Sequence, residues 1–258
     1  MTISIIQAVL IGLWTAFCFS GLLLGIYTNR SIVLSFGVGI ILGDLPTALT
    51  MGAISELAYM GFGVGAGGTV PPNPIGPGIF GTLMAITSAG KVTPEAALAL
   101  STPIAVGIQF LQTSAYTIHA GSPESAVKHL RAGNISKFRG VANRTIITFA
   151  IVGFALGFLG AYSMDTLLSL VELIPPVLLN GLSVAGKMLP AIGFAMILSV
   201  MAKKELIPFV LLGYVCAAYL ELPVIGIAIV GSIFALKEFF NKSEQPVVKQ
   251  EEAQDDWI

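Results

Sequence analysis

The chain has 258 residues, of which 55% are hydrophobic and only 10% are charged, and its net charge is −1. A soluble globular domain carries about 25% charged residues, so this chain has too few charged side chains to coat a water-soluble particle. The composition excludes a cytosolic enzyme, a nucleic-acid-binding protein and a disordered scaffold. It favours one polytopic membrane domain.

The chain opens with a stretch that contains no charge before Arg30. Met1 to Ser4 includes neither Lys nor Arg, whereas a secretory signal peptide begins with a positively charged region. Residues 3–26 are long enough to cross a hydrocarbon core, which needs about 20 apolar residues. We therefore expect a first transmembrane helix that is retained in the mature protein.

Two carboxylates follow, Asp44 in GIILGDLPTALT and Glu56 in GAISELAYMGFG, each the single charge of an apolar neighbourhood. A carboxylate at the bilayer centre costs about 2.5–3.5 kcal/mol on insertion scales, and such residues usually line pathways. On one continuous helix the two would lie about 18 Å apart, although Pro46 favours a break just after Asp44. An interfacial helix cap is an equal reading of Asp44. Glu56 is the strongest single candidate, because unbroken apolar sequence flanks it.

Glycine and proline gather in residues 61–81, GFGVGAGGTVPPNPIGPGIFG, with eight Gly and four Pro in 21 positions. Such a stretch cannot hold a continuous helix, because Pro removes hydrogen-bond donors and Gly weakens the helical state. It contains no charge, and irregular backbone at membrane depth survives only where protein or a water-filled cavity satisfies it. We expect a re-entrant element that lines a substrate cavity; a plain extracellular loop is the alternative.

Five basic residues and one acid distinguish the segment from Glu124 to Arg144, in which Lys128, Arg131, Lys137, Arg139 and Arg144 supply the positive charge. The positive-inside rule predicts a cytoplasmic loop over about residues 121–144. This loop is either a docking surface for a soluble partner or a contact with anionic lipid. His119 and His129 flank or lie in it without a phosphoacceptor signature, so we expect neither to be phosphorylated.

The second half alternates one long apolar run, 145–164, with runs such as 173–186 and 206–220 that are short for a full crossing. Short runs indicate broken or re-entrant helices. We predict an all-α polytopic membrane protein with a membrane-embedded domain over residues 1–236. Residues 237–258 are polar and are predicted to form a disordered tail.

The sequence contains no P-loop, no GxSxG elbow and no metal-spaced His/Cys set. We therefore expect no catalytic residue, no metal and no cofactor in this chain. Cys18 and Cys216 lie in apolar runs and are interpreted as small buried hydrophobic residues.

Four stretches resemble the IIC subunit of the mannose-fructose-sorbose family of bacterial phosphotransferase-system sugar transporters. They are ISIIQAVLIGLW, GVGIILGDLPTALTMGAISELAYMGFG, VGAGGTVPPNPIGPG and IPPVLLNGLSVAGKMLPAIGFAMIL. The resemblance extends to about residue 236, and the LGD…G…E…G and IPxxxxNGLxxAGxM patterns are specific in combination.

The resemblance implies a permease in the bacterial cytoplasmic membrane that works with a second membrane subunit, IID, in a trimer of IIC–IID pairs. It also implies that sugar is delivered to a soluble IIB domain, which carries a phosphohistidine supplied through IIA and a general phosphocarrier protein. The implied sugar-binding residues, where the motif regions contain polar side chains, are Glu56, Asn73, Asp44 and Asn180.

Sugar hydroxyls suit a buried carboxylate and a neighbouring amide, which can accept and donate in turn. Asn73 departs from many family members, which have an acidic residue near this place, and the GGTVPPNPIGPG form is more similar to the N-acetylgalactosamine and hexosamine branch. Two other hypotheses remain: an ion- or proton-coupled secondary transporter that uses Asp44 and Glu56, and a structural membrane subunit with no site of its own.

Overall fold

The structure, a computed structural model, describes residues 2–60, 72–201 and 203–243, and every regular element in these ranges is helical. This confirms the predicted all-α class. The chain divides into two compact units, Met1–Val200 and Met201–Ile258. The α-helices are α1 (Ile5–Gly21), α2 (Ser31–Leu42), α3 (Leu45–Tyr59), α4 (Thr82–Thr87), α5 (Pro94–Ile118), α6 (Ser122–Arg131), α7 (Ile135–Tyr162), α8 (Met164–Glu172), α9 (Pro176–Met201), α10 (Ile207–Ala218) and α11 (Val224–Ser243). Short 3-10 helices η1 (Leu22–Leu24) and η3 (Lys204–Leu206) and a π-helix η2 (Gly76–Gly81) complete the order.

Several helices of the described ranges have the length and apolarity of membrane spans. Four stretches qualify: Ile5–Leu24, Pro94–Arg131, Ile135–Tyr162 and Pro176–Ser199. Three apolar helices are shorter, Ser31–Leu42, Gly76–Thr87 and Ile207–Ala218, and none of these reaches the roughly 20 residues of a crossing. The combination confirms a polytopic membrane fold with broken and re-entrant helices.

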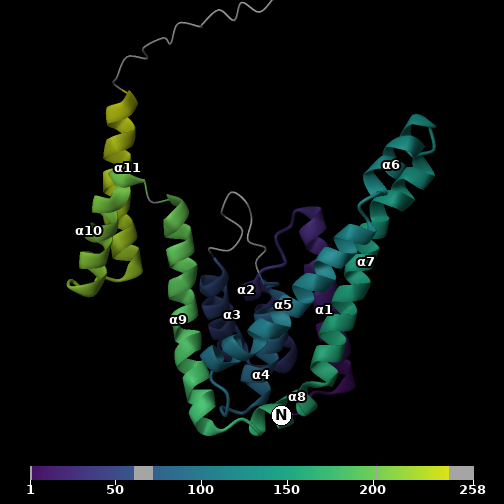
Figure 1. Cartoon of the computed structure of the whole chain (residues 1–258), viewed down its shortest axis with the longest axis horizontal. Helices are drawn as coiled ribbons and strands as arrows, with labels where there is room; N and C mark the ends of the chain where they lie inside the picture. The colour runs from purple at the N-terminus through teal and green to yellow at the C-terminus, as the bar shows by residue number, and fades with distance from the viewer. Residues whose placement is uncertain (1, 61–71, 202, 244–258) are drawn as a thin grey trace, which may run out of the picture. The chain divides into compact units, whose positions relative to one another are not determined.

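Helices α1 and α7 pack against each other in antiparallel directions (Figure 1). A side chain at Gly157 would meet Thr15, and one at Gly153 would meet Ala16 and Phe19. Small residues let membrane helices approach closely, so that dispersion contacts replace the hydrophobic effect that is absent in lipid. Phe19 of α1 and Phe149 of α7 close this seam, with ring centroids 4.8 Å apart.

Helices α2 and α3 form an antiparallel hairpin around Gly43, which lies in the left-handed region at φ +81°. Asp44 caps α3, because its Oδ1 accepts a 3.2 Å hydrogen bond from the Thr47 backbone N–H. Pro46 occupies the first turn of α3 and does not break the helix, because no intrahelical N–H is required there. Asp44 is thus a helix cap, as one reading of it predicts, and a break between helices lies beside it, between Leu42 and Leu45. That this cap lies at a membrane interface stays a prediction.

The segment from Asn73 to Thr87 enters the interior of the first unit, and residues 75–88 are all buried. Gly76 lies against Ala105 of α5, Gly78 against Leu34 of α2, and Gly81 against Met51 of α3. Ser35 Oγ donates to the Gly78 carbonyl of the π-helix η2 over 3.3 Å. Residues 61–71 of the predicted re-entrant element lie outside the described residues, and residues 75–81 are helical and buried.

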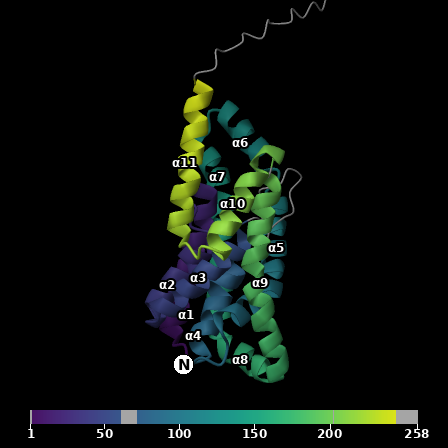
Figure 2. The same ribbon diagram turned by 90° about the vertical axis from the view of Figure 1, so that its left-hand side faces the viewer.

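The segment over about residues 121–144, predicted to be a cytoplasmic loop between membrane halves, is mostly helical, and its cytoplasmic placement stays a prediction. Helix α6 occupies Ser122–Arg131, a turn follows with Gly133 at φ +69°, and α7 begins at Ile135. Pro123 stands in the first turn of α6 and Gly133 just beyond its end, as is typical of helix boundaries. Glycine and proline therefore mark the ends of helices here and not an irregular loop. Figures 1 and 2 both place α6 at the opposite end of the first unit from α4, α8 and the N-terminus.

In the second unit, α10 and α11 pack through Phe209 and Phe234, whose ring centroids are 5.6 Å apart. The turn between them contains Glu221 at φ +49°. Helix α11 continues past residue 237 to Ser243, so residues 237–243 of the predicted tail are helical. The charges of LKEFFNKS do not end a helix, because Lys and Glu are good helix formers. Residues 244–258 of the predicted tail lie outside the described residues.

Candidate functional site

The charges at the carboxyl end of α3 form an ion pair. Glu56 lies in the last turn of α3, where the helix dipole is unfavourable to a carboxylate. A guanidinium nitrogen of Arg30, the residue that precedes α2, contacts the Glu56 carboxylate. The Glu56 side chain is 19% exposed and that of Arg30 52% exposed, so the pair is partly exposed. Arg30 stands out in the sequence as the first charged residue of the chain. The sequence does not indicate that Glu56 is its partner.

Asn73 is fully buried, and its side chain is engaged on both atoms. Its Oδ1 accepts from the Ile75 backbone N–H at 3.0 Å, and its Nδ2 donates to Gln112 Oε1 at 2.5 Å. The Asn73 backbone N–H donates to the Ala105 carbonyl at 3.1 Å. The amide therefore fixes the entry of the buried segment to α5, which is a structural role in this conformation.

Gln112 is a polar residue of the buried interior that the sequence analysis did not single out. It is 8% exposed, and its Nε2 donates to the Tyr116 hydroxyl at 3.4 Å. The Tyr116 ring in turn lies 5.0 Å from that of Phe149. This series of contacts joins Asn73 to the α1–α7 seam through residues of α5. In the sequence, the only indication of a role for Gln112 is that it is a polar residue within the charge-free run 96–123.

Glu56 and Asn73 lie toward the same end of the first unit. A side chain at Gly81 would meet both Met51 of α3 and Ser101 of α5. Met51 and Ser101 therefore lie at about the same depth, from which the positions of Glu56 and Asn73 can be compared. Glu56 lies about 8 Å farther along α3, and Ala105, which binds Asn73, about 6 Å farther along α5. The structure thus brings two of the four sequence-predicted site residues to a similar depth, one accessible and one buried.

The other two predicted residues lie elsewhere. Asp44 stands before the first residue of α3, about 18 Å along the helix from Glu56. Asn180 is exposed on α9, whereas the contact of α9 with the end of α3 is made by Gly193, which abuts the backbone of Leu57 and Ala58. About 20 Å of helix separates Asn180 from that contact.

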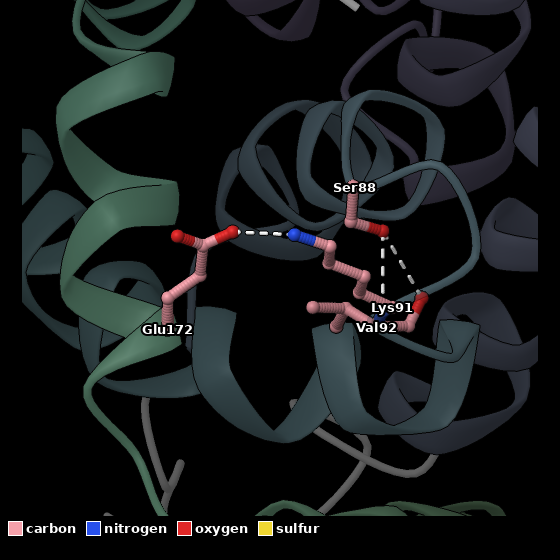
Figure 3. Close-up of polar contacts among 4 residues, drawn as sticks. All are labelled: Ser88, Lys91, Val92 and Glu172. Atoms are coloured by element: carbon pink, nitrogen blue, oxygen red, sulfur yellow. Dashed lines mark hydrogen bonds and ion pairs between the residues drawn. The ribbon is translucent and has the colours of Figure 1, made fainter.

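A second group of polar residues surrounds a cavity at the opposite end of the first unit. Lys91 Nζ donates to Glu172 Oε1 at 2.7 Å and joins the α4–α5 turn to α8 (Figure 3). This hydrogen bond, and then the charge of Lys91, holds the pKa of the Glu172 carboxyl below its ordinary value. Ser88 accepts from the Val92 backbone N–H at 3.2 Å and orders the turn. The cavity, about 570 Å³, is otherwise lined mainly by apolar side chains such as Leu168 and Val171.

The histidines and possible metal ligands offer little chemistry of their own. His119 Nε2 lies 2.9 Å from Thr148 Oγ1 and ties the end of α5 to α7. It borders a cavity of about 270 Å³ between α6 and α7. Among residues 2–60, 72–201 and 203–243, no cluster of three or more His, Cys, Asp or Glu side chains is arranged to hold a metal ion.

Comparison with known proteins places these features in a family. The sequence matches the family described as PTS system sorbose-specific IIC component over residues 5–237. It is 31% identical over 176 residues to N-acetylgalactosamine permease IIC component 1 of Escherichia coli K12, which covers 68% of this chain and 65% of that protein. The chain thus spans just under two thirds of the length of that relative.

Two solved structures share the fold. One, a membrane protein, superposes with a TM-score of 0.82 at 27% identity and covers 92% of this chain and 96% of the other. A chain of the cryo-electron microscopy structure of the mannose transporter ManYZ with microcin E492 superposes with a TM-score of 0.58, also at 27% identity, over 93% of this chain and 96% of that chain. The family match extends over nearly all of the membrane-embedded sequence, and the chain therefore belongs to the family of PTS system sorbose-specific IIC components, multi-pass proteins of the bacterial inner membrane.

Proposed function

We propose that this chain binds and translocates a hexose or amino sugar in phosphoenolpyruvate-dependent uptake, together with a IID membrane subunit. It passes the sugar to a soluble IIB domain, where phosphorylation takes place. The family membership and the likeness to a chain of the mannose transporter ManYZ support this proposal. A trimer of IIC–IID pairs is the assembly that we expect, and native mass spectrometry of the purified complex would test it.

The observation that carries the proposal is the partly exposed Arg30–Glu56 pair among apolar helices. A charge pair within a membrane domain is costly and commonly marks a substrate pathway. The two groups are complementary toward a neutral sugar: the carboxylate accepts hydrogen bonds from hydroxyls, and the guanidinium donates to their oxygen atoms. We assign Glu56 as the main sugar-binding group and Arg30 as its partner.

We assign Asn73 a positioning role in this site. Because its amide is buried and bonded to Gln112 and Ile75, its contribution is to hold the start of the buried segment that begins at Asn73 against α5. Asp44 caps a helix at the other end of α3, and Asn180 is exposed on α9, so both stand outside the proposed site.

The identity of the sugar is proposed from the names of the relatives and from the chemistry of the Arg30–Glu56 pair. The relative that is 31% identical is named for N-acetylgalactosamine and the structural neighbour for mannose. Both names designate pyranose sugars with several free hydroxyls, which fit a carboxylate–guanidinium pair. We place N-acetylgalactosamine and galactosamine first and mannose second.

No catalytic step is assigned to this chain, and we place the phosphoryl-carrying residues on IIA and IIB. The hydrogen bonding of His119 supports this assignment, because its imidazole Nε2 is hydrogen-bonded to Thr148 Oγ1 between α5 and α7. The ion-coupled alternative requires Asp44 and Glu56 to act together, and their separation at the two ends of α3 disfavours a shared ion site.

The test is sugar binding by the purified IIC–IID complex, together with phosphoenolpyruvate-dependent uptake. Glu56→Gln removes the charge from an acceptor of hydrogen bonds worth about 1.5–3 kcal/mol, so affinity should fall roughly 10- to 100-fold. Glu124→Gln, an exposed carboxylate of α6, is the matched control and should bind as the wild type does. Unchanged binding in Glu56→Gln would remove Glu56 from the site, and uptake abolished by an uncoupler without phosphoenolpyruvate dependence would favour ion coupling.

A further inference from the structure

Helix α6 and the beginning of α7 form a basic hairpin at one end of the first unit. Its five basic side chains are all exposed, and its only acid, Glu124, lies in the first turn of α6. The remaining charges of the first unit are distributed unevenly. Toward the opposite end the acids prevail: Asp44, Glu95, Asp165 and Glu172 against Lys91 and Lys187. By the positive-inside rule, the end that carries the hairpin faces the cytoplasm.

The length of α7 divides the basic residues of the hairpin by depth. From residue 145 to Tyr162 the helix is free of charge and about 27 Å long, close to the thickness of the hydrocarbon core. Arg144 therefore lies at the edge of the core, and Arg139 about 7 Å beyond it. The headgroup layer is about 5–8 Å thick on each side, so these two arginines reach lipid phosphates.

Lys137 and Arg131 lie farther out. Lys137 is about 10 Å beyond Arg144 along α7, and the turn around Gly133 about 15 Å beyond it. Helix α6 packs beside this part of α7, since Ala126 faces Val141 and Ala142 across the small cavity. Arg131, the last residue of α6, consequently lies near the tip, whereas Lys128, two residues beyond Ala126, lies at about the depth of Arg139.

Apolar side chains are exposed beside these two charges. Leu130 is 55% exposed and Ile135 58%. At a depth beyond the headgroups these side chains meet water and not acyl chains, so their exposure is costly without a partner. A mixture of exposed apolar and basic groups that protrudes from a membrane surface is suited to a protein partner.

We propose that this tip, composed of Arg131 and Lys137 with Leu130 and Ile135, is the docking surface for the acidic face of a soluble protein. The identity of that protein rests on the proposed function: it is the IIB phosphocarrier that receives the sugar. Lys128, Arg139 and Arg144 are assigned to anionic lipid headgroups. The five basic residues thus serve two partners at two depths.

The experiment measures binding of purified IIB to the intact IIC–IID complex in detergent at several salt concentrations. The tip variant Arg131→Gln/Lys137→Gln should weaken binding roughly tenfold and flatten its salt dependence, because two screened attractions are lost. The control is Arg139→Gln/Arg144→Gln, which removes two charges of the same hairpin and should bind IIB as the wild type does.

Two outcomes overturn the docking surface. One is unchanged IIB binding by the tip variant; the other is an equal loss in the control, which would show a general charge effect. A third measurement counts phosphatidylglycerol retained from vesicles of 30% phosphatidylglycerol in phosphatidylcholine. If the tip variant alone loses this lipid and retains IIB, the tip is a lipid contact and the proposal is wrong.

Sugar binding is measured on the same samples and separates this inference from the proposed function. Both variants should bind sugar as the wild type does, which also shows that they are folded. A wild-type complex that binds IIB at the tip but none of the sugars would contradict the proposed substrate class alone. A complex that binds sugar while the tip variant retains full IIB affinity would contradict the docking surface alone.

Discussion

The Asn73 side-chain amide donates a 2.5 Å hydrogen bond to Gln112 Oε1 and so joins two residues that are 39 apart in sequence. Both side chains are buried, and a buried polar group without its partner costs about 1–3 kcal/mol. The bond therefore fixes where the buried segment that begins at Asn73 meets α5, which in turn determines the depth of this segment beside Glu56.

Truncation of either residue should destabilise the protein by about 1–3 kcal/mol, and the double variant should lose less than the sum of the two. The variants are Asn73→Ala, Gln112→Ala and their combination, compared by unfolding in a mild detergent. Gln109→Ala, one turn earlier on α5, is the control, because no side-chain hydrogen bond of Gln109 occurs among the described residues. Strictly additive losses would show that the bond contributes nothing.

The glycines of α9 should differ sharply in their tolerance of a methyl group. A Cβ at Gly193 would collide with the Leu57 carbonyl oxygen, and one at Gly186 with that of Glu95. Backbone atoms cannot rotate away, so Gly193→Ala should cost about 1–3 kcal/mol through overpacking. Gly181→Ala meets open space and should be neutral or stabilising by about 0.5–1 kcal/mol. Thermal denaturation of the purified variants would measure both, and an equal Tm for the two contradicts the packing of α9 on α3.

The Lys91–Glu172 pair should make a pH-dependent contribution with a defined sign. Lys91 lowers the pKa of Glu172 in the folded protein from its ordinary value of 4.5, so the folded state favours the charged carboxylate. The stabilisation is then fully present above the ordinary pKa and is lost as the pH falls through the lowered one. The Tm difference between wild type and Glu172→Gln should shrink as the pH is lowered below about 4.5. A difference that grows toward acid pH would contradict the pair.

The orientation of the first unit can be read with single cysteines. A cysteine at Gly133, in the hairpin turn, should react with a membrane-impermeant maleimide only from the cytoplasmic side, and one at exposed Ser169 of α8 only from the outside. The two native cysteines, Cys18 and Cys216, are buried and free, so the background should be low. The reverse pattern would invert the assignment and place the basic hairpin outside the cell.

Several features of the fold and the site were predictable because they depend on local sequence. The charge-free opening predicts a spanning helix that α1 with η1 supplies, and the isolated carboxylate of Glu56 identifies the charged group of the candidate site. Pro123 lies in the first turn of α6 and Gly133 in the turn before α7, although proline and glycine also occur in irregular loops. The same residue types occur in both settings, and only the helix-forming sequence between them distinguishes the two.

Hydrophobicity, charge and backbone propensity act over a few residues, so the amino-acid sequence suffices to predict the membrane class, the helical fold and Glu56 and Asn73 as candidate residues. Tertiary contacts are needed to pair Glu56 with Arg30, to bond the Asn73 amide to Gln112, and to place Asp44 and Asn180 apart from them. These relationships depend on the antiparallel packing of α2 on α3 and on the insertion of residues 73–87 against α5. Such contacts are set by the shapes of surfaces distant in sequence, to which no single segment gives a signal.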